Sequence, residues 1–386
     1  MIHLDAATTL PPLPEALRAA SLAQAEAWGD PAALGPFSER AFSVMEEARK
    51  RVAALVEATA EGVLFTSGGT EADNLAIKGL CAAAPSSRRR LVISAIEPYA
   101  VDHPARTLER QGWTLCRIPV DGLGRVTPRA LAAVLTPDTA LVSVVLAHPA
   151  MGAWQELEPL TRLARAAGAL FHTDACLAVP FGPVSFRALG VDALSLSGHH
   201  FGGVAGAGAL ILRPGTSLRP LIEGGTQEGG LRPGMPALGA VAALGEAAGI
   251  LAKDGPVRFA KLAVLGRRLG RGLARLDGSR LTGDPERRIP GHASCVLAGL
   301  DGEALVTALL AGGVLASTGS ACASQALKAD PALAAMGIPE PLARGSLRLS
   351  AGPDITEEEV DRALSIVAGA VARLRSLAPS AAGAVA

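Results

Sequence analysis

The sequence predicts an α/β protein in which a doubly wound sheet forms a large lobe and a smaller lobe follows it. The chain has 386 residues, 49% of them hydrophobic, which is long for one domain and enough to fill two cores. Between residues 62 and 212, apolar runs of strand length alternate with helical segments, the spacing of a doubly wound sheet. Polar residues follow several of these runs, at the strand ends where such sheets bind ligands.

The N-terminal segment carries Pro11, Pro12 and Pro14 before a helical pattern, so we expect an arm over residues 1–20 rather than a strand. From residue 42 to residue 60, apolar positions recur at three- and four-residue steps, which is typical of an amphipathic helix. Expected strands cover 62–65, 91–96, 114–119, 140–146, 169–174, 193–196 and 209–212, and expected helices cover 75–80, 105–111, 128–134 and 157–167.

The pattern changes near residue 258, where an arginine-rich helix over 265–276 precedes two short apolar strands. We therefore expect a large lobe over 21–257 and a small lobe over 258–375. The N-terminal arm is expected to join the small lobe. The last residues, 376–386, are small and apolar without periodicity, so a flexible tail is expected there.

Composition and charge argue against several classes of function. Lys+Arg and Asp+Glu each number 36, and no basic run is interleaved with aromatics, so a nucleic-acid partner is not expected. With neither a signal-like N-terminus nor an uninterrupted run of about 18 apolar residues, we expect a cytoplasmic protein that does not enter a membrane.

The five cysteines form no C-x-x-C pair, which argues against a disulfide framework and a self-contained zinc site. Four of them lie in apolar runs, as buried structural thiols do. Cys322 is the exception, in a segment of small and polar residues.

Residues 67–74 read Ser-Gly-Gly-Thr-Glu-Ala-Asp-Asn between a strand and a helix. The glycines let the backbone approach an anion, Thr70 adds a hydroxyl, and the helix N-terminus supplies free N–H groups, which together make a phosphate cradle. A Ser/Thr helix cap would explain the same residues.

His148, Asp174 and His199 fall at the carboxyl ends of expected strands. An aspartate there is also a common turn residue. Neutral imidazole is a frequent metal ligand, so His199 and His200 suggest a metal site, to which His148 could contribute. Because neighbouring side chains on a strand point to opposite faces, we do not expect both adjacent histidines to bind one ion.

These motifs together resemble the cysteine desulfurase family, in the class-V aminotransferase group of pyridoxal phosphate (PLP) enzymes. The resemblance extends over residues 4–372. It includes two further motifs, Leu-Asp-Ala-Ala-Thr-Thr-Leu-Pro over residues 4–11 and Ser-Leu-Ser-Gly-His over residues 195–199. It implies fold type I of PLP-dependent transferases, aspartate aminotransferase-like. That fold has a mixed, mostly parallel sheet in the large domain and a smaller α+β C-terminal domain, and it forms a homodimer.

The resemblance also implies a cofactor site. Thr70, Ser197 and His199 correspond to phosphate-binding positions, and Asp174 to the carboxylate that keeps the pyridine nitrogen protonated. His148 stands where the family has an asparagine near the ring oxygen.

Two further positions are implied to act on substrate and sulfur. Arg348 matches the arginine that grips the substrate carboxylate by a bidentate fork, with a surface cation as the alternative. Cys322, in Ser-Thr-Gly-Ser-Ala-Cys, matches the loop cysteine whose thiolate takes up a persulfide sulfur.

His200 stands where the family has the lysine that holds PLP as a Schiff base, and imidazole has no primary amine. Departures also occur at other ring-binding positions: Pro98 replaces a stacking histidine, Leu177 a glutamine, and Met235 a threonine that a neighbouring subunit lends. The chain's lysines, none of which is an obvious substitute, are Lys50, Lys78, Lys253, Lys261 and Lys328.

Three hypotheses follow. In the first, the protein is a pseudoenzyme without Schiff-base PLP, in which Cys322 accepts sulfur or ligates an iron–sulfur cluster together with a scaffold or sulfur-acceptor protein. In the second, PLP binds noncovalently on Thr70, Asp174, Ser197 and His199, and His200 moves protons in slow desulfurase or lyase turnover. In the third, the chain is a non-catalytic regulatory partner of an intact desulfurase.

Overall fold

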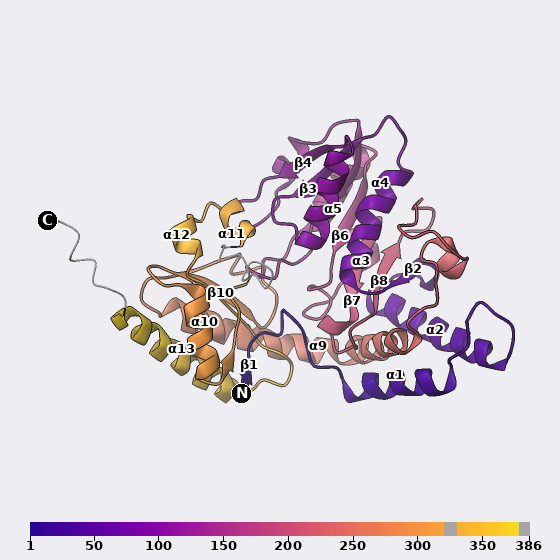
Figure 1. The fold of residues 1–386 in the computed structure, drawn as a ribbon. Helices are drawn as coiled ribbons and strands as arrows, with labels where there is room; N and C mark the ends of the chain where they lie inside the picture. Colours follow the sequence, from indigo (N-terminus) through magenta and orange to yellow (C-terminus); the bar gives the residue numbers. More distant parts are fainter. Residues whose placement is uncertain (320–329, 378–386) are drawn as a thin grey trace.

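The computed structural model describes residues 1–319 and 330–377. Two lobes are connected along the helix α9 (Leu238–Ala274), whose first part packs on α1 (Pro14–Glu26) and α2 (Pro36–Leu55) and whose last part reaches the small lobe (Figure 1). The expected lobe boundary between residues 257 and 258 therefore falls inside one continuous helix.

The large lobe contains a seven-stranded sheet in the order β2-β8-β7-β6-β5-β3-β4. β8 is antiparallel to both of its neighbours and the other pairs are parallel, so the sheet is mixed and mostly parallel, as expected. Its strands are β2 (Val63–Thr66), β3 (Arg90–Ser94), β4 (Thr114–Ile118), β5 (Thr139–Ser143), β6 (Leu170–Asp174), β7 (Ala193–Ser197) and β8 (Gly208–Leu212).

Helices connect these strands and cover the sheet (Figure 1). The first begins as α3 (Gly69–Asn74), continues through the π-helical turn η2 (Leu75–Gly79) and ends as α4 (Leu80–Ala83). The others are α5 (Tyr99–Arg110), α6 (Pro128–Ala132), α7 (Leu157–Ala166) and α8 (Phe186–Leu189), with 3-10 turns η1 (Ala60–Gly62), η3 (Gly198–His200) and η4 (Gln227–Gly230).

The small lobe is built on an antiparallel sheet in the order β12-β10-β9. Its elements are β9 (Ser279–Leu281), β10 (His292–Leu297), α10 (Gly302–Ala311), β11 (Val314–Leu315), α11 (Pro331–Ala335), α12 (Glu340–Ala343), β12 (Ser346–Ser350) and α13 (Glu357–Leu377).

The N-terminal segment contains a short strand, which the sequence pattern did not predict. β1 (Ile2–His3) pairs in parallel with β11 of the small lobe. Two residues are too few to show an alternating pattern, and the prolines that suggested an arm come only after this strand. Beyond it, Ala6 N–H donates to Ser350 O and Leu13 N–H to Gly202 O, so the segment crosses from the small lobe to the large one.

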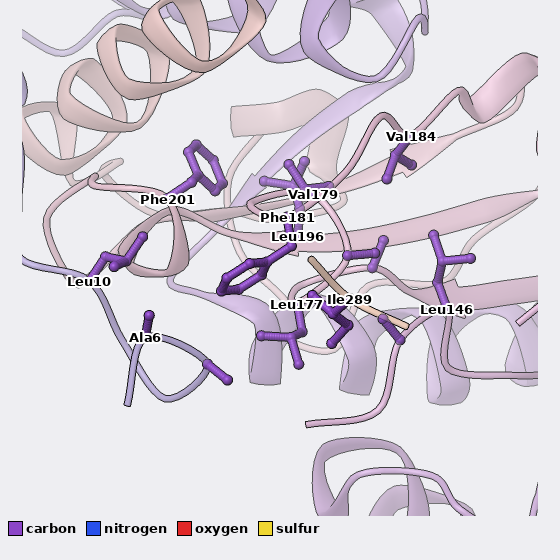
Figure 2. Packing of buried hydrophobic residues seen from close by; sticks show 14 of the residues in the cluster. Ala6, Leu10, Leu146, Leu177, Val179, Phe181, Val184, Leu196, Phe201 and Ile289 are labelled. Carbon is purple, nitrogen blue, oxygen red and sulfur yellow. The ribbon is translucent and has the colours of Figure 1, made fainter. Parts of the chain in front are cut away.

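Where the N-terminal segment crosses between the lobes, its apolar residues are buried in the hydrophobic core. Figure 2 shows Leu10 of the N-terminal segment beside Phe201, with Ala6, Leu177 and Leu196 in the same cluster. The core thus holds the N-terminal segment against the ends of β6 and β7. Among the helices of the described residues, none is long and apolar enough to cross a membrane.

Candidate functional site

A cavity of about 690 Å³ lies at the carboxyl ends of β5 and β6 and after β7, and we call it the strand-end cavity. Its wall also includes the N-terminal segment and β12 of the small lobe. Five of the candidate site residues named from the sequence line it, namely Thr70, His148, Asp174, His200 and Arg348. Ser197 and His199 lie beside it, at the end of β7 and in η3.

The expected phosphate cradle lies where β2 ends and α3 begins. Gly69 is required by close packing, because a Cβ there would lie 2.5 Å from Cys176 Sγ and 3.3 Å from Ser197 Cβ. The N–H of Ser67 donates to Glu71 Oε2 at 2.7 Å. One donor of the loop is therefore already satisfied by the chain's own carboxylate, and Thr70 is exposed at the cavity wall.

Asp174 ends β6 with its side chain buried and its Oδ1 accepting the N–H of Cys176 at 2.8 Å. Burial raises the pKa of its carboxyl. A second carboxyl, that of Asp73 on α3, is 1% exposed, and burial together with the charge of Asp174 raises its pKa well above the usual range.

The imidazole of His172 lies beside Asp73. His172 Nε2 lies 3.6 Å from Asp73 Oδ1 and 3.0 Å from Ser195 Oγ, while Nδ1 lies 2.9 Å from Ser143 Oγ. Because burial lowers the pKa of His172 to about 3, its imidazole is neutral at physiological pH and supplies no counter-charge.

Glu97 is a site residue that the sequence analysis passed over. Its Oε1 accepts the hydroxyl of Ser94 and, at 2.8 Å, the N–H of Val145, and its side chain lines the cavity. Burial, assisted by the charge of Asp174, raises its pKa to about 8. Its position in the sequence could have identified it as a site residue, because Glu97 follows the apolar run of β3 just as Asp174 ends the apolar run of β6.

The two adjacent histidines lie on the turn η3 and not on a strand, so the argument that their side chains must point apart is wrong. Their rings are 4.1 Å apart with an interplanar angle of 34°. Thr9 Oγ1 lies 3.1 Å from His199 Nδ1, and burial lowers the pKa of His200 to about 3. Over residues 1–319 and 330–377, no group of three or more His, Cys, Asp or Glu side chains is arranged to hold a metal ion.

Arg348 is buried, 2% exposed, so the surface-cation alternative is wrong. Its Nη2 donates to Asp5 Oδ1 and to Thr8 Oγ1, both at 2.5 Å, and its Nη1 lies 3.4 Å from Pro149 O. The terminal nitrogens are thus committed to the chain itself, and Nε is the N–H that lacks a partner among the described residues.

His148 follows β5, is 4% exposed, and accepts the N–H of Ala150 at Nδ1. Cys176, expected as a core thiol, is buried but also lines the cavity; burial and the nearby carboxyls raise its pKa, so it is a thiol and not a thiolate. Lys78 lines the cavity as well. Cys322 and Lys328 lie outside the described residues.

Comparisons with known proteins agree on one family. The model of the family described as aminotransferase class-V matches residues 2–363. A cysteine desulfurase of Cereibacter sphaeroides is 41% identical over 98% of this chain and 97% of its own. The cysteine desulfurase IscS of Methanosarcina thermophila is 35% identical over 98% and 94%. A solved structure of a NifS-like protein, 28% identical, superposes with a TM-score of 0.90 over 97% of this chain and 100% of that one.

Proposed function

Because this chain belongs to the cysteine desulfurase family of the class-V aminotransferases, we propose that it is a desulfurase-like protein that works without covalently held PLP. Its proposed role is in sulfur or iron–sulfur metabolism, with Cys322 as the sulfur acceptor or as a thiolate ligand to a cluster. The observation that carries the proposal is the imidazole of His200 in the cavity wall, where the family resemblance requires a lysine.

The cavity residues do not fit a covalent link at position 200. A Schiff base requires a primary amine, which His200 lacks. Of the four lysines that the structure describes, Lys78 lines the cavity, and it does so from η2 rather than from the turn after β7.

The residues do fit one end of a noncovalently bound pyridine ring. The buried carboxyl of Asp174 would be stabilised by a protonated ring nitrogen, and Thr70 offers a hydroxyl at the cavity wall. When bound, PLP supplies an electron sink for carbanion chemistry. Neutral His200, whose Nδ1 has no partner among the described residues, is able to accept a hydrogen bond there. This favours weak, noncovalent PLP-dependent desulfurase or lyase activity as the second candidate.

We further propose a homodimer in the cytoplasm, with an iron–sulfur scaffold or a sulfur-acceptor protein as its partner. Support for the dimer comes from large apolar side chains exposed beside α1 and α2, including Trp28 at 60%, Leu34 at 102% and Phe42 at 54%. Water-exposed apolar surface of this kind is usually covered by another protein surface.

The absorption spectrum of the purified protein, before and after borohydride reduction, tests the absence of a covalent cofactor. We expect the reduction to fix no pyridoxyl group to the chain. A pyridoxyl group found on any lysine peptide, with Lys78 as the candidate among the described lysines, would overturn the proposal.

The role of Cys322 is tested separately with Cys322→Ser. Loss of bound iron or of persulfide labelling is expected, whereas Cys116→Ser, which changes a partly exposed thiol elsewhere, leaves both intact. If Cys322→Ser retains all iron and labels normally, the thiol has no such role.

Anaerobic incubation with PLP and cysteine distinguishes the second candidate. Sulfide formed faster than by free PLP supports it, and a rate equal to that of free PLP excludes it.

A further inference from the structure

Positive charge is concentrated along the second half of α9, where this helix reaches the small lobe. Residues 255–275 contain six lysines and arginines and no aspartate or glutamate. The whole chain has 36 basic and 36 acidic residues, so the residues outside this segment hold 30 basic against 36 acidic ones. One helical segment is therefore strongly basic in a chain that is otherwise net negative.

The periodicity of α9 places exposed residues of this segment on the face opposite the core. Four leucines of the segment are buried, namely Leu262, Leu265, Leu269 and Leu273. Five exposed side chains recur at steps of seven, three, four and four residues, namely Val257, Val264, Arg267, Arg271 and Arg275. Steps of three, four and seven residues keep side chains on one face of a helix, and we call this face the α9 ridge. None of its five residues lines the strand-end cavity.

The arginines of the α9 ridge have no counter-charge within the protein. Among the described residues, the side chains of Arg267, Arg271 and Arg275 make no hydrogen bond or ion pair. Residues 320–329 and 378–386 contain no aspartate or glutamate that could pair with them. Arg268, by contrast, is paired with α13, where its Nε donates to Asp361 Oδ1 at 2.6 Å. The three ridge guanidinium groups are thus free to bind an external anion.

Helix polarity alone does not explain the α9 ridge. Cations are favoured near a helix C-terminus, but this effect falls off within the last turn. Arg267 lies about two turns before Ala274, the last residue of α9. The side chains of Val257 and Val264 are 79% and 41% exposed and gain nothing from the dipole. A protein partner accounts for both kinds of residue, since protein interfaces combine apolar contacts with arginine.

We propose that the α9 ridge docks an acidic helical segment of a partner protein. Arginines four residues apart are spaced about 6 Å along the helix axis, and carboxylates at four-residue steps on a second helix have the same spacing. An apolar side chain one turn before those carboxylates would contact Val264. The inference rests on the proposed function in one respect, namely that the protein works together with a protein partner.

Other polyanions fit the α9 ridge less well. A single-stranded nucleic acid binds where aromatic side chains stack on its bases, and the ridge has no aromatic residue. An anionic membrane surface is bound by large apolar side chains that enter the lipid, and the ridge offers two valines seven residues apart.

Fluorescence anisotropy of a peptide labelled with an uncharged dye tests the docking on the full-length protein. The probe is an alanine-based helical peptide of about 20 residues, with three glutamates at four-residue steps and a leucine one turn before them. The matched probe carries glutamine in place of each glutamate. We expect the glutamate peptide to bind about tenfold more tightly, because each exposed ion pair strengthens binding by a factor of about 2 to 5. Raising the salt concentration from about 0.05 M to about 0.3 M should remove most of this difference.

The ridge variant combines Arg267→Gln, Arg271→Gln and Arg275→Gln. It should weaken binding of the glutamate peptide about tenfold and leave binding of the glutamine peptide unchanged. Because the three side chains are exposed and unpaired, its thermal unfolding should match that of the wild type within about 2 °C.

The control variant combines Arg110→Gln, Arg129→Gln and Arg187→Gln. It removes the same charge from exposed positions on α5, α6 and α8, and it should bind both peptides as the wild type does. Equal affinity of the two peptides for the wild type, full binding by the ridge variant, or an equal loss in the control variant would overturn the docking.

Other occupants of the α9 ridge are outcomes of the same experiment. Oligothymidylate or phosphatidylserine vesicles that bind more tightly than the glutamate peptide, and lose that binding in the ridge variant, would refute an acidic protein segment. Sedimentation showing that the ridge variant alone loses a dimer of the wild type would assign the ridge to a second copy of the chain, which also refutes it.

Peptide binding requires neither Cys322 nor the strand-end cavity, so the two proposals fail separately. If Cys322→Ser keeps its iron and its persulfide labelling, the proposed role of that thiol is wrong, whatever the peptides do. If the two peptides bind equally, the α9 ridge is not a docking surface, whatever the thiol does.

Discussion

Replacing Asp5 by alanine removes the carboxylate that pairs with the buried guanidinium of Arg348. Asp5 belongs to the N-terminal segment and Arg348 to β12, and Thr8 and Pro149 O contact the same guanidinium. The ion pair therefore joins the N-terminal segment to the small lobe beside the strand-end cavity, whose wall includes Thr8 and Arg348. Without Asp5, the guanidinium of Arg348, which is 2% exposed, loses the carboxylate that pairs with it among the described residues.

Breaking a buried pair by removing one partner costs about 3–5 kcal/mol. We expect the lower end, about 3 kcal/mol, because the Asp5 side chain is 15% exposed and Thr8 remains to accept a hydrogen bond. An unfolding entropy of about 2.1 cal/mol/K per residue, taken over 386 residues, converts this loss into a Tm lowered by about 4 °C.

Differential scanning calorimetry measures the change. Glu15→Ala, which breaks an exposed pair with Arg18, is the control and should shift Tm by less than about 1 °C. Adding Arg348→Met to Asp5→Ala should recover part of the loss, since the unpaired charge is gone. A Tm for Asp5→Ala within 1 °C of the wild type would refute the assigned role of this pair.

Two further predictions concern the cavity wall, and a third concerns the packing of Gly69 beside it. His200→Lys should let added PLP form a borohydride-reducible link at position 200, which peptide mass spectrometry detects. His103→Lys is the control and should form no such link. If neither variant forms a link, the site lacks more of what PLP binding requires than the primary amine. Burial raises the pKa of Glu97 in the folded protein from 4.5 to about 8. The wild type should therefore lose stability relative to Glu97→Gln as the pH rises from about 5 to 8. Urea unfolding at each pH measures this difference, and a difference that does not change with pH would contradict the prediction. Gly69→Ala should cost about 1–3 kcal/mol by overpacking against Cys176 Sγ, and Cys176→Ala should relieve part of that cost in the double variant; equal losses with and without Cys176 would place the strain elsewhere.

Several site positions could be predicted because polar residues stood at the ends of apolar runs. Asp174 ends β6 and His148 follows β5, and the carboxyl ends of both strands open into one cavity, as the sheet topology requires. Glu97 follows β3 by the same rule, yet beside Pro98 it carried no motif of its own. Only the tertiary structure shows that Glu97 Oε2 has no hydrogen-bond partner among the described residues.

Local sequence determined the order of strands and helices, because the alternation of apolar runs with helical patterns reflects which side chains each element can bury. It also determined that position 200 has no amine. The strand β1 escaped prediction, because its partner β11 is more than 300 residues away.

Only the tertiary structure decided what the charged residues do. From the sequence, Arg348 could be a surface cation or a guanidinium free to bind a carboxylate. In the fold it is a buried ion whose Nη2 donates to Asp5 and Thr8. The physical reason is that burial and pairing depend on segments far apart in the chain: a side chain's type gives its charge, but its neighbours in space decide what that charge costs and which ligand it can bind.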